Sequence, residues 1–526
     1  MLTRSGYKGK PPVLNIPQKQ EEPEEPYGSA DWEEPRGGIP NAGYIFDGVF
    51  FGKSSRPDYA HIATDSHQGA PICSTPGNHT LIIGRTRVGK GCRVVIPTLL
   101  RANLVKRSAL IVDPKGELAA VTARARREPF AGKDFHTDVH IINPWGELKP
   151  TFQKLGLTPF ATYNPLDLLD RNDPNVTSIA QSMAAAICPT EKGTGNAAFW
   201  SQSAANILTG VLLWLTYTPG ETKTLGRARE IVTKPQKEFQ DEFLIPMAAV
   251  SDPAWRAITQ NAGPFVGMAL ETFSGIQGNL AQFTSFLSDP LIDAATATSS
   301  FSMLDLIRKP TSIYLVIPPH MMEVQRTWLR LMISAGMQTY KHHASQNAQR
   351  CMFLIDEFPA LGRLDEIPRD LATMAGYGVD FTLIAQGIDQ LTHEYGKAAN
   401  TIINNCAYKW FCGVHDPESA EYLSKMLGKK TVQTQSGSTS MGFNPGGGTS
   451  GSSTSFGQTG RDLMMPAEII NLGRDAAILL APGDKPHYLR PIDYWDLQTA
   501  FANLREFYPH LYWEPPMRWD ENPLPH

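Results

Sequence analysis

The sequence predicts an α/β fold in which a mainly parallel sheet is interrupted by an inserted all-α domain. Three observations support this prediction. Strands that are apolar on both faces, such as 108–113 and 379–385, alternate with helical segments, which is typical of a parallel sheet covered on each side. Residues 173–298 instead show helical periodicity with few alternating β-branched runs. A strand at 80–83 runs into a glycine-bounded loop and an amphipathic segment at 92–100, the order that phosphate-binding loops require.

The loop after this strand has the spacing G-x-x-x-x-G-K. Gly84 and Gly89 allow backbone N–H groups to turn inward toward phosphate oxygens, and the next helix adds the positive end of its dipole. Lys90 would place a positive charge on the β- and γ-phosphates. The predicted nucleotide contacts are Gly84, Arg85, Thr86, Arg87, Val88, Gly89, Lys90, Gly91 and Cys92.

Position 91 departs from the usual phosphate-binding loop. Ser or Thr normally follows the lysine and holds Mg²⁺, whereas this chain has Gly91. These residues alone therefore leave open a glycine turn that begins an unrelated helix.

Polar residues also follow the later strands. Strand 352–355 delivers Asp356 and Glu357, which match the second half of a nucleoside triphosphatase site. One carboxylate would hold Mg²⁺ through water, and the other would orient or deprotonate the attacking water. Gln386 follows strand 379–385 and is placed to sense the γ-phosphate, although a polar turn residue is the alternative. A surface Asp-Glu pair is the corresponding alternative for Asp356 and Glu357.

Strand 108–113 ends in Asp113-Pro114-Lys115-Gly116-Glu117. Polar residues just beyond the ends of parallel strands fall at the ligand-binding edge of the sheet. For Lys115 and Glu117, active-site roles and turn-forming or salt-bridge roles are both open.

Composition limits the function classes. The chain has 526 residues, enough for two to four domains of about 150 residues each. Its net charge of −4 gives no overall basic field, so nucleic acid contacts must come from local clusters. There are two such clusters: one consists of Arg85, Arg87, Arg93, Arg101, Lys106 and Arg107, and the other of Arg124, Arg126 and Arg127. The six cysteines have no metal-binding spacing, and no apolar run reaches the ~18 residues of a membrane span, so a soluble protein is predicted.

The predicted domain organisation has five parts. They are an extended acidic and Pro-rich tail (1–42), the first part of a nucleotide-binding domain with a small β-rich lead-in (43–172), an all-α inserted domain (173–298), the second part of the nucleotide-binding domain (299–505) and a C-terminal tail (506–526). Residues 433–460 are Ser/Gly-rich without apolar periodicity, which predicts a flexible loop inside the second part.

Several of these segments together resemble the coupling-protein ATPases of type IV secretion systems, the conjugative DNA-transfer motors of the TraG/VirD type. The matching segments are 84–91 with 94–100, 112–117, Phe199-Trp200, 354–362, 386–391 and 461–468. The resemblance extends over about residues 75–495. It implies a RecA-like P-loop NTPase core, with ATP and Mg²⁺ bound between the subunits of a homo-hexameric ring. Lys90, Glu357 and Gln386 would be catalytic, and Asp356 and Glu357 would hold the metal.

The resemblance also implies partners and a location. Single-stranded DNA bound to a relaxase, or a protein effector, would be passed to components of the type IV secretion channel. The family usually has N-terminal transmembrane helices, which this sequence lacks. We therefore expect a cytoplasmic protein that is peripherally associated with the bacterial inner membrane, either because a segment was removed or because a separate subunit supplies the anchor.

One further family feature is altered. Just ahead of Gly376-Tyr377-Gly378 the family often has an arginine that reaches the nucleotide of the neighbouring subunit, and here this position is Ala375. Arg363 or Arg369 is the expected substitute.

The sequence thus predicts an ATP-hydrolysing coupling protein that drives transfer of DNA or protein to a membrane channel. The alternative is a substrate-recruitment platform for protein effectors with little DNA pumping. A viral or chromosomal DNA pump of the same superfamily is disfavoured by the residues after Lys90 and around Asp356.

Overall fold

The computed structural model describes residues 28–33, 48–55, 71–100, 107–127, 137–189, 197–442 and 449–496. The chain divides into two compact units. One unit comprises residues 1–31 and 424–464, and the other comprises residues 32–423 and 465–526.

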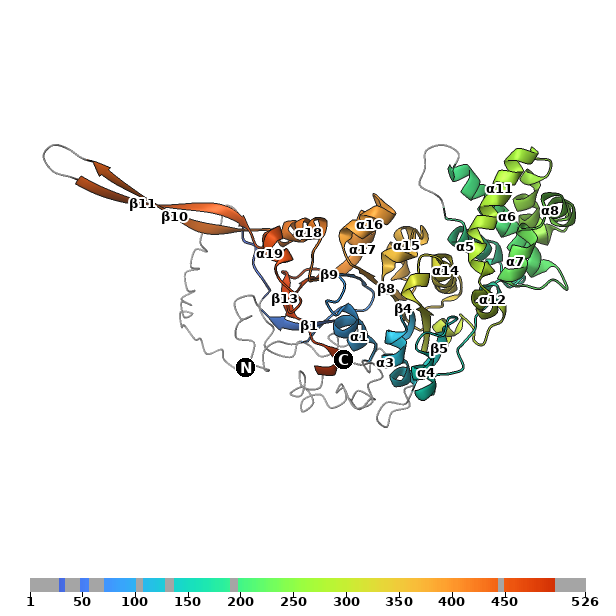
Figure 1. Cartoon of the computed structure of the whole chain (residues 1–526), viewed down its shortest axis with the longest axis horizontal. Coiled ribbons are helices and arrows are strands. Elements are labelled where there is room, and N and C mark those ends of the chain that lie inside the picture. The colour runs from blue at the N-terminus through green and yellow to red at the C-terminus, as the bar shows by residue number, and fades with distance from the viewer. Residues whose placement is uncertain are drawn as a thin grey trace, which may run out of the picture. The chain divides into compact units, whose positions relative to one another are not determined.

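The larger unit is built on one eleven-stranded sheet with the order β2-β1-β13-β12-β9-β3-β8-β7-β4-β6-β5. Figure 1 shows β9, β8, β4 and β5 of this sheet following one another across the unit. The strands are β1 (Phe50–Ser55), β2 (Pro71–Cys73), β3 (His79–Ile83), β4 (Ser108–Pro114), β5 (Asp138–Ile142), β6 (Thr311–Ile317), β7 (Cys351–Ile355), β8 (Val379–Ala385), β9 (Cys406–Cys412), β12 (Ala477–Leu480) and β13 (His487–Arg490).

The strands from β9 to β5 are all parallel to their neighbours. Strands β3, β6, β7 and β8 are buried along their whole length, as expected for strands covered by helices on both faces. The carboxyl ends of these strands lie at the same edge of the sheet. Ile83 of β3 pairs with Ala385 of β8, and Ile355 of β7 pairs with Leu383 of β8 and with Val112 of β4. The predicted α/β fold with a mainly parallel sheet is confirmed.

The other end of the sheet is antiparallel, with β12 on β9, β13 on β12, β1 on β13 and β2 on β1. A small β-rich segment was predicted ahead of the glycine-bounded loop, and strands β1 and β2 lie in the described part of this segment. The indole N–H of Trp410 in β9 donates to the carbonyl of Phe51 at 3.1 Å, which fixes β1 to the parallel strands.

The helices of the nucleotide-binding part connect these strands and cover the sheet. They are α1 (Ile96–Leu99), α3 (Glu117–Arg127), α4 (Lys149–Lys154), α13 (Asp305–Arg308), α14 (Arg326–His343), α15 (Glu366–Met374), α16 (Ile388–Tyr395), α17 (Ala398–Asn405), α18 (Pro417–Leu427) and α19 (Pro466–Ile470). A π-helical turn, Gly91–Val95, precedes α1, so the predicted helix at 92–100 is present with a widened first turn.

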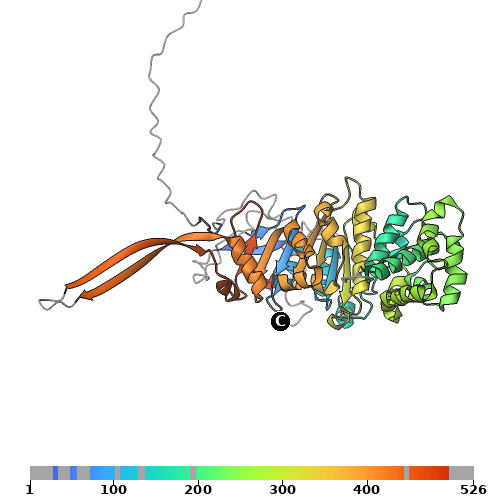
Figure 2. The same cartoon turned by 90° about the horizontal axis from the view of Figure 1, so that it is seen from above.

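Residues 173–189 and 197–298 contain helices and no strand, and their helices gather in one block (Figure 2). They are α5 (Val176–Ile187), α6 (Ala197–Tyr217), α7 (Leu225–Val232), α8 (Gln236–Phe239), α9 (Ile245–Ala248), α10 (Arg256–Ala262), α11 (Leu270–Phe283) and α12 (Pro290–Ala297). Helix α5 packs on α14, where the Nε of Arg330 donates to the carbonyl of Ala186 at 3.1 Å.

The smaller unit contains a long antiparallel hairpin of β10 (Lys429–Gly442) and β11 (Thr449–Asp462). Its register runs without a shift from Lys429 opposite Asp462 to Gly442 opposite Thr449, and Ser29 forms a bridge with Lys430. The prediction of a flexible loop at 433–460 was therefore wrong. A two-stranded ribbon satisfies its backbone groups by pairing across the hairpin and needs no apolar face, so the absence of apolar periodicity did not exclude strands.

The tail predictions fall largely outside the described residues, namely 1–27 and 34–42 at the start of the chain and 506–526 at its end. Within the described part of the chain, no helix combines the length and the hydropathy that crossing a membrane would require.

Candidate functional site

The glycine-bounded loop lies between β3 and the π-helical turn. The amide of Gly84 donates to the carbonyl of Ala385 in β8 at 3.2 Å, which anchors the start of the loop. Gly89 has a φ of 85°, a left-handed conformation that L side chains rarely adopt, so glycine is required there. Arg87 is also left-handed, with a φ of 64°. The loop therefore has the curled backbone that the spacing predicts.

The side chain of Lys90 folds back onto this loop. Its Nζ donates to the carbonyls of Gly84 at 2.5 Å and Arg85 at 3.3 Å, and the residue is buried. Burial lowers the pKa of Lys90, while the negative charges of Glu357 and Asp356 act in the opposite direction. The ammonium group thus lies within the field of both carboxylates, although β3 and β7 are separated in the sheet by β8.

Asp356 and Glu357 lie immediately beyond β7, as predicted. Glu357 is left-handed, with a φ of 52°, and its amide donates to the Asp356 carboxylate at 3.0 Å. A non-glycine residue in this conformation is uncommon, and such strain concentrates at functional sites. Gln386, at the end of β8, donates from its Nε2 to Oε2 of Glu357 at 3.1 Å. The structure therefore brings Gln386 and the Asp356–Glu357 pair together from two neighbouring strand ends.

The two carboxylates form an environment that favours a bound cation. Burial and the adjacent Glu357 raise the pKa of Asp356 to about 6, while the positive charges of Lys90 and Lys115 act in the opposite direction. A divalent cation would relieve this repulsion, and carboxylate oxygens are the ligands that Mg²⁺ prefers. Asp356 and Glu357 could therefore hold Mg²⁺, directly or through water. Among the described residues there is no group of three or more His, Cys, Asp or Glu side chains that could form an all-protein metal site.

Asp113, at the end of β4, was not assigned a role from the sequence. Its fully buried carboxylate accepts the amides of Leu118 at 3.2 Å and Ala119 at 2.7 Å, and so caps the start of α3. An Asp followed closely by a Gly turn and a helix was the available signal. Asp113 fixes the turn that carries Lys115 and Glu117 beside the site.

The candidate trans arginines lie on and next to α15. The Nε of Arg363 is 2.5 Å from Oδ1 of Asp365, and the Nε of Arg369 donates to the backbone carbonyl of Asp365 at 3.3 Å. Ala375 directly follows α15. A role for Arg363 or Arg369 at a neighbouring subunit remains a prediction.

Several arginines of the basic clusters have structural partners. Arg93 is buried and pairs with Asp493 at 2.9 Å, and Arg107 pairs with Asp380 at 3.6 Å. Arg126 is fully buried and donates to the carbonyl of Leu99 at 3.0 Å. These three side chains hold the fold together, so the sequence clusters overstate the basic surface. Arg85 and Arg87, on the glycine-bounded loop, are exposed.

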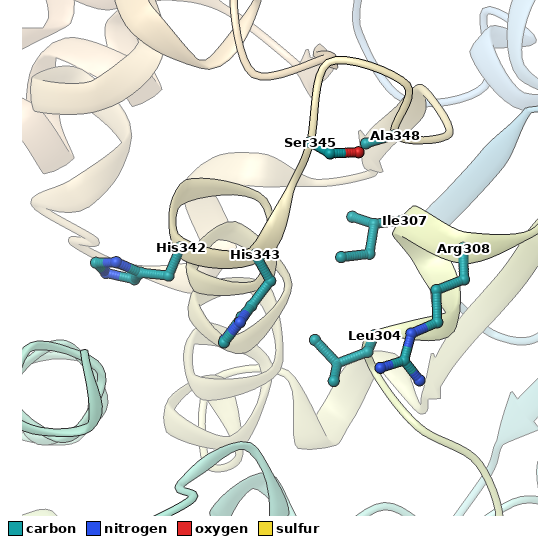
Figure 3. Close-up of a pocket in the computed structure, with 7 residues that line it drawn as sticks. All are labelled: Leu304, Ile307, Arg308, His342, His343, Ser345 and Ala348. Carbon is teal, nitrogen blue, oxygen red and sulfur yellow. The ribbon is translucent and has the colours of Figure 1, made fainter. Parts of the chain in front are cut away.

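A pocket of about 610 Å³ lies at the C-terminal end of α14 and contains none of the predicted site residues (Figure 3). It is lined by Leu304, Ile307, Arg308, His342, His343, Ser345 and Ala348.

A phosphate-binding loop follows strand β3, and a carboxylate pair follows strand β7, which is separated from β3 by β8 alone. This arrangement defines a P-loop NTPase with a RecA-like core. Comparison with known sequences makes this assignment specific. The chain belongs to the family "Type IV secretory system Conjugative DNA transfer", whose family model matches residues 38–510. The family expected from the sequence is confirmed.

Two relatives illustrate the similarity. Protein VirD4 of Rhizobium radiobacter is 27% identical over 489 residues, which cover 90% of this chain and 64% of that protein. The conjugal transfer protein TraG of Agrobacterium fabrum (strain C58) is 26% identical over 490 residues, covering 88% of this chain and 69% of that protein. The chain thus spans less than two thirds of the length of this VirD4.

Solved structures show the same fold. The bacterial conjugative coupling protein TrwBdeltaN70, in its unbound monoclinic form, superposes with a TM-score of 0.57 at 17% identity, covering 86% of this chain and 96% of that one. The plasmid coupling protein TrwB in complex with ADP and Mg²⁺ superposes with a TM-score of 0.56 at 16% identity, covering 84% and 95%.

Proposed function

We propose that this chain is an ATP-hydrolysing coupling protein of a type IV secretion or conjugation system, which recruits a relaxase–DNA or protein substrate and drives its transfer to the membrane channel. The observation that carries the proposal is the convergence of three strand ends. Lys90 follows β3, Gln386 follows β8, and Asp356 and Glu357 follow β7, with Gln386 hydrogen-bonded to Glu357 at 3.1 Å. Family membership supports the same proposal.

The chemistry assigns a role to each side chain. Lys90 releases the carbonyls of Gly84 and Arg85 and donates to the β- and γ-phosphates of ATP. Glu357, held by Gln386, orients a water molecule and accepts its proton as the water oxygen bonds to the γ-phosphorus. The bond between the γ-phosphorus and the bridging oxygen breaks, and ADP leaves with the electron pair. Bound Mg²⁺ would neutralise charge on the phosphate oxygens.

ATP and Mg²⁺ are the proposed ligands. The proposed nucleotide contacts are those of the loop and its continuation, residues 84–92, and the proposed metal ligands are Asp356 and Glu357. The relative TrwB, which has been solved with ADP and Mg²⁺, supports this choice.

The proposed assembly follows from the family. A homo-hexamer would place the nucleotide between subunits and gather six copies of the exposed Arg85 and Arg87. Single-stranded DNA with a relaxase, or a protein effector, is the proposed cargo, and type IV secretion channel components are the proposed recipients. We place the chain at the cytoplasmic face of the bacterial inner membrane, with an anchor supplied by a separate subunit or by a segment outside this sequence.

Replacement of Lys90 tests the enzymatic part. We expect Lys90→Ala to lower ATP turnover at least about a hundredfold, because the transferring phosphoryl group loses a charge-assisted contact. The exposed Lys154→Ala serves as a control for loss of a lysine and should leave turnover unchanged. Thermal unfolding of both variants should match the parent chain. Unchanged turnover in Lys90→Ala would remove the ATPase assignment.

Cargo and assembly need separate measurements. Turnover of the purified chain with and without single-stranded DNA, together with its mass in solution, distinguishes a DNA motor from other roles. Stimulated turnover in hexamers is the expected result. Absence of stimulation by DNA, with active ATP hydrolysis, would contradict DNA transport and favour the second candidate.

The second candidate is a recruitment platform for protein effectors. It is favoured by exposed apolar side chains on the helical block, among them Leu270 at 68% and Phe199 at 48% exposure. Residues of this kind commonly mark interaction surfaces. A Phe199→Asp, Leu270→Asp double variant should then lose binding of a protein substrate while its ATP turnover stays at the parent level.

A further inference from the structure

The turn after β4 faces the proposed nucleotide site. Strand β4 lies beside β7, and Val112 pairs with Ile355, so the residues that follow Val112 run level with Asp356 and Glu357. Two further observations place this turn against the glycine-bounded loop. A Cβ at Gly91 would lie 4.0 Å from the Leu118 side chain, and the negative charge of Glu117 acts on the Cys92 thiol.

The turn is held in one conformation by hydrogen bonds on every side. The buried Asp113 carboxylate accepts the amides of Leu118 and Ala119, and its backbone carbonyl accepts the amide of Gly116 at 3.3 Å. The amide of Lys115 donates to the carbonyl of Ile317 at 3.0 Å. The backbone of Lys115 is therefore fixed from β6 and from within the turn.

Lys115 is in a conformation that favours glycine. Its φ is 83°, and Gly116, with a φ of 76°, follows it. Non-glycine residues in this region are strained, and the strain persists only where the surrounding structure enforces it. The side chain of Lys115 is nevertheless exposed, and its positive charge acts on Asp356. A strained residue with an exposed side chain contributes little to the core, so the reason for lysine at this position lies in its ammonium group.

We propose that Lys115 is a second cationic contact to the γ-phosphate of the bound nucleoside triphosphate, opposite Lys90. The proposal rests on the proposed ATPase function. An ammonium group has three donors and no acceptor, so it cannot hold a cation, and its strongest hydrogen bonds are to anionic oxygens. The nearest anionic group that the site can acquire is the terminal phosphate held between Lys90 and the Asp356–Glu357 pair.

One departure from the usual phosphate-binding loop gives this contact a purpose. Gly91 offers no hydroxyl to a metal ion. Phosphoryl transfer depends on positive charge around the equatorial oxygens of the transferring group. Lys115 supplies such a charge from the same chain that supplies Lys90.

Ion pairing of Lys115 with Asp356 is the competing explanation. In that case Lys115 would act on the carboxylate in every nucleotide state, and its loss would affect ADP and ATP alike. A contact to the γ-phosphate distinguishes the two nucleotides, because only ATP and its analogues carry that group.

The test compares affinities for two nucleotides. Lys115→Gly removes the ammonium group and suits the backbone at a φ of 83°, so it should fold at least as well as the parent chain. Lys115→Arg retains the charge, and Lys154→Ala controls for loss of an exposed lysine elsewhere in the chain. For each full-length variant, dissociation constants are measured for Mg·ADP and for a non-hydrolysable Mg·ATP analogue, together with ATP turnover.

We expect Lys115→Gly to weaken binding of the ATP analogue about tenfold while leaving ADP binding within about twofold, and to lower turnover by about ten- to a hundredfold. Lys115→Arg should restore most of the preference for the triphosphate. An unchanged ratio of the two dissociation constants in Lys115→Gly would overturn the proposal. If the ratio is unchanged while Lys90→Ala still abolishes turnover in the same series, the role of Lys115 is wrong but the proposed ATPase function stands. A parent chain that binds neither nucleotide would overturn the proposed ATPase function and this inference together.

Discussion

The two ends of the large sheet treat charged side chains differently. At the carboxyl ends of the parallel strands, Asp356 and Glu357 lie together, and burial raises the pKa of Asp356 to about 6. Arg93, in the π-helical turn after the glycine-bounded loop, is buried too, but its guanidinium reaches the antiparallel end, where it is paired with Asp493 after β13 and donates to the carbonyl of Arg474 before β12.

This difference separates structural charge from functional charge. A buried ion that has its partners within the chain holds elements together, whereas like charges placed side by side need a ligand to neutralise them. Charge removal at the carboxyl ends of the parallel strands should therefore affect ligand binding. Charge removal at the antiparallel end should instead affect stability.

The largest effect on stability is expected for Arg93→Ala. The substitution leaves Asp493 without its partner and removes the tie between the π-helical turn and the segment after β13. We expect a loss of about 3 kcal/mol in the free energy of unfolding, since breaking a largely buried pair is costly. The midpoint of thermal unfolding should fall by several degrees.

Arg474→Ala is the matched control for Arg93→Ala. The Arg474 side chain is 65% exposed and pairs with Asp475, which is 87% exposed, so its loss should have little effect on stability. Below the unfolding transition, Arg474→Ala should bind nucleotide like the parent chain. A Cβ at Gly89 would lie 3.0 Å from the Arg93 side chain, so a loss of nucleotide binding in Arg93→Ala without any loss of stability would contradict a structural role for Arg93.

The sequence predicted the local parts of this comparison. Strand, loop and helix at 80–100 are adjacent in the chain, and so are β7 and the Asp356–Glu357 pair, so their patterns could be read from short segments. Gln386 was predicted to follow strand 379–385, and it lies beside Glu357 because neighbouring parallel strands end at one edge. The catalytic roles of these residues stay predictions.

The parts that could not be predicted depend on distant contacts or on backbone pairing. Arg93 and Asp493 are 400 positions apart, so Arg93 looked like a surface charge of a basic cluster. In the hairpin of β10 and β11, no residue of 429–435 and 456–462, the part for which burial is described, is buried, so no apolar period of two marks these strands. Their Ser, Thr and Gly residues are equally common in loops. Left-handed backbone at Lys115 and Glu357 leaves no sequence signal, because neither residue is glycine.

A smaller effect is expected at Glu366, which is buried behind the parallel strands in α15. Gln338 of α14 donates to its Oε1 at 2.7 Å, while Oε2 of Glu366 and Oε1 of Gln338 have no hydrogen-bond partner among the described residues. Burial raises the pKa of Glu366 above 4.5, while the positive charge of Lys341 acts in the opposite direction. The folded state therefore favours the protonated carboxyl, so the stability that this group contributes falls as the pH rises from 4.5 through the raised pKa.

Glu366→Gln should remove this dependence on pH. The amide is neutral at every pH and can donate to Gln338 Oε1, so we expect about 1 kcal/mol of added stability at pH 8 and almost none near pH 5. Thermal unfolding of the parent and variant at both values of pH measures the effect. A constant difference between them across this range would show that Glu366 keeps one protonation state.

The smallest effect is expected for Gly91→Ser, which changes the parallel edge without disturbing its packing. A Cβ at position 91 would meet only the Leu118 side chain at 4.0 Å, so the variant should unfold at the temperature of the parent chain. The new hydroxyl would stand where phosphate-binding loops usually hold Mg²⁺, and the Mg²⁺ concentration that gives half-maximal turnover should fall about two- to fivefold. Gly84→Ser is the matched control, because a Cβ there would lie 2.5 Å from the carbonyl oxygen of Cys412 and must displace the loop. If Gly91→Ser leaves the Mg²⁺ requirement unchanged, then Asp356, Glu357 and water already fill the coordination sphere of Mg²⁺. In that case the missing hydroxyl at position 91 gives no reason for a second cation at Lys115.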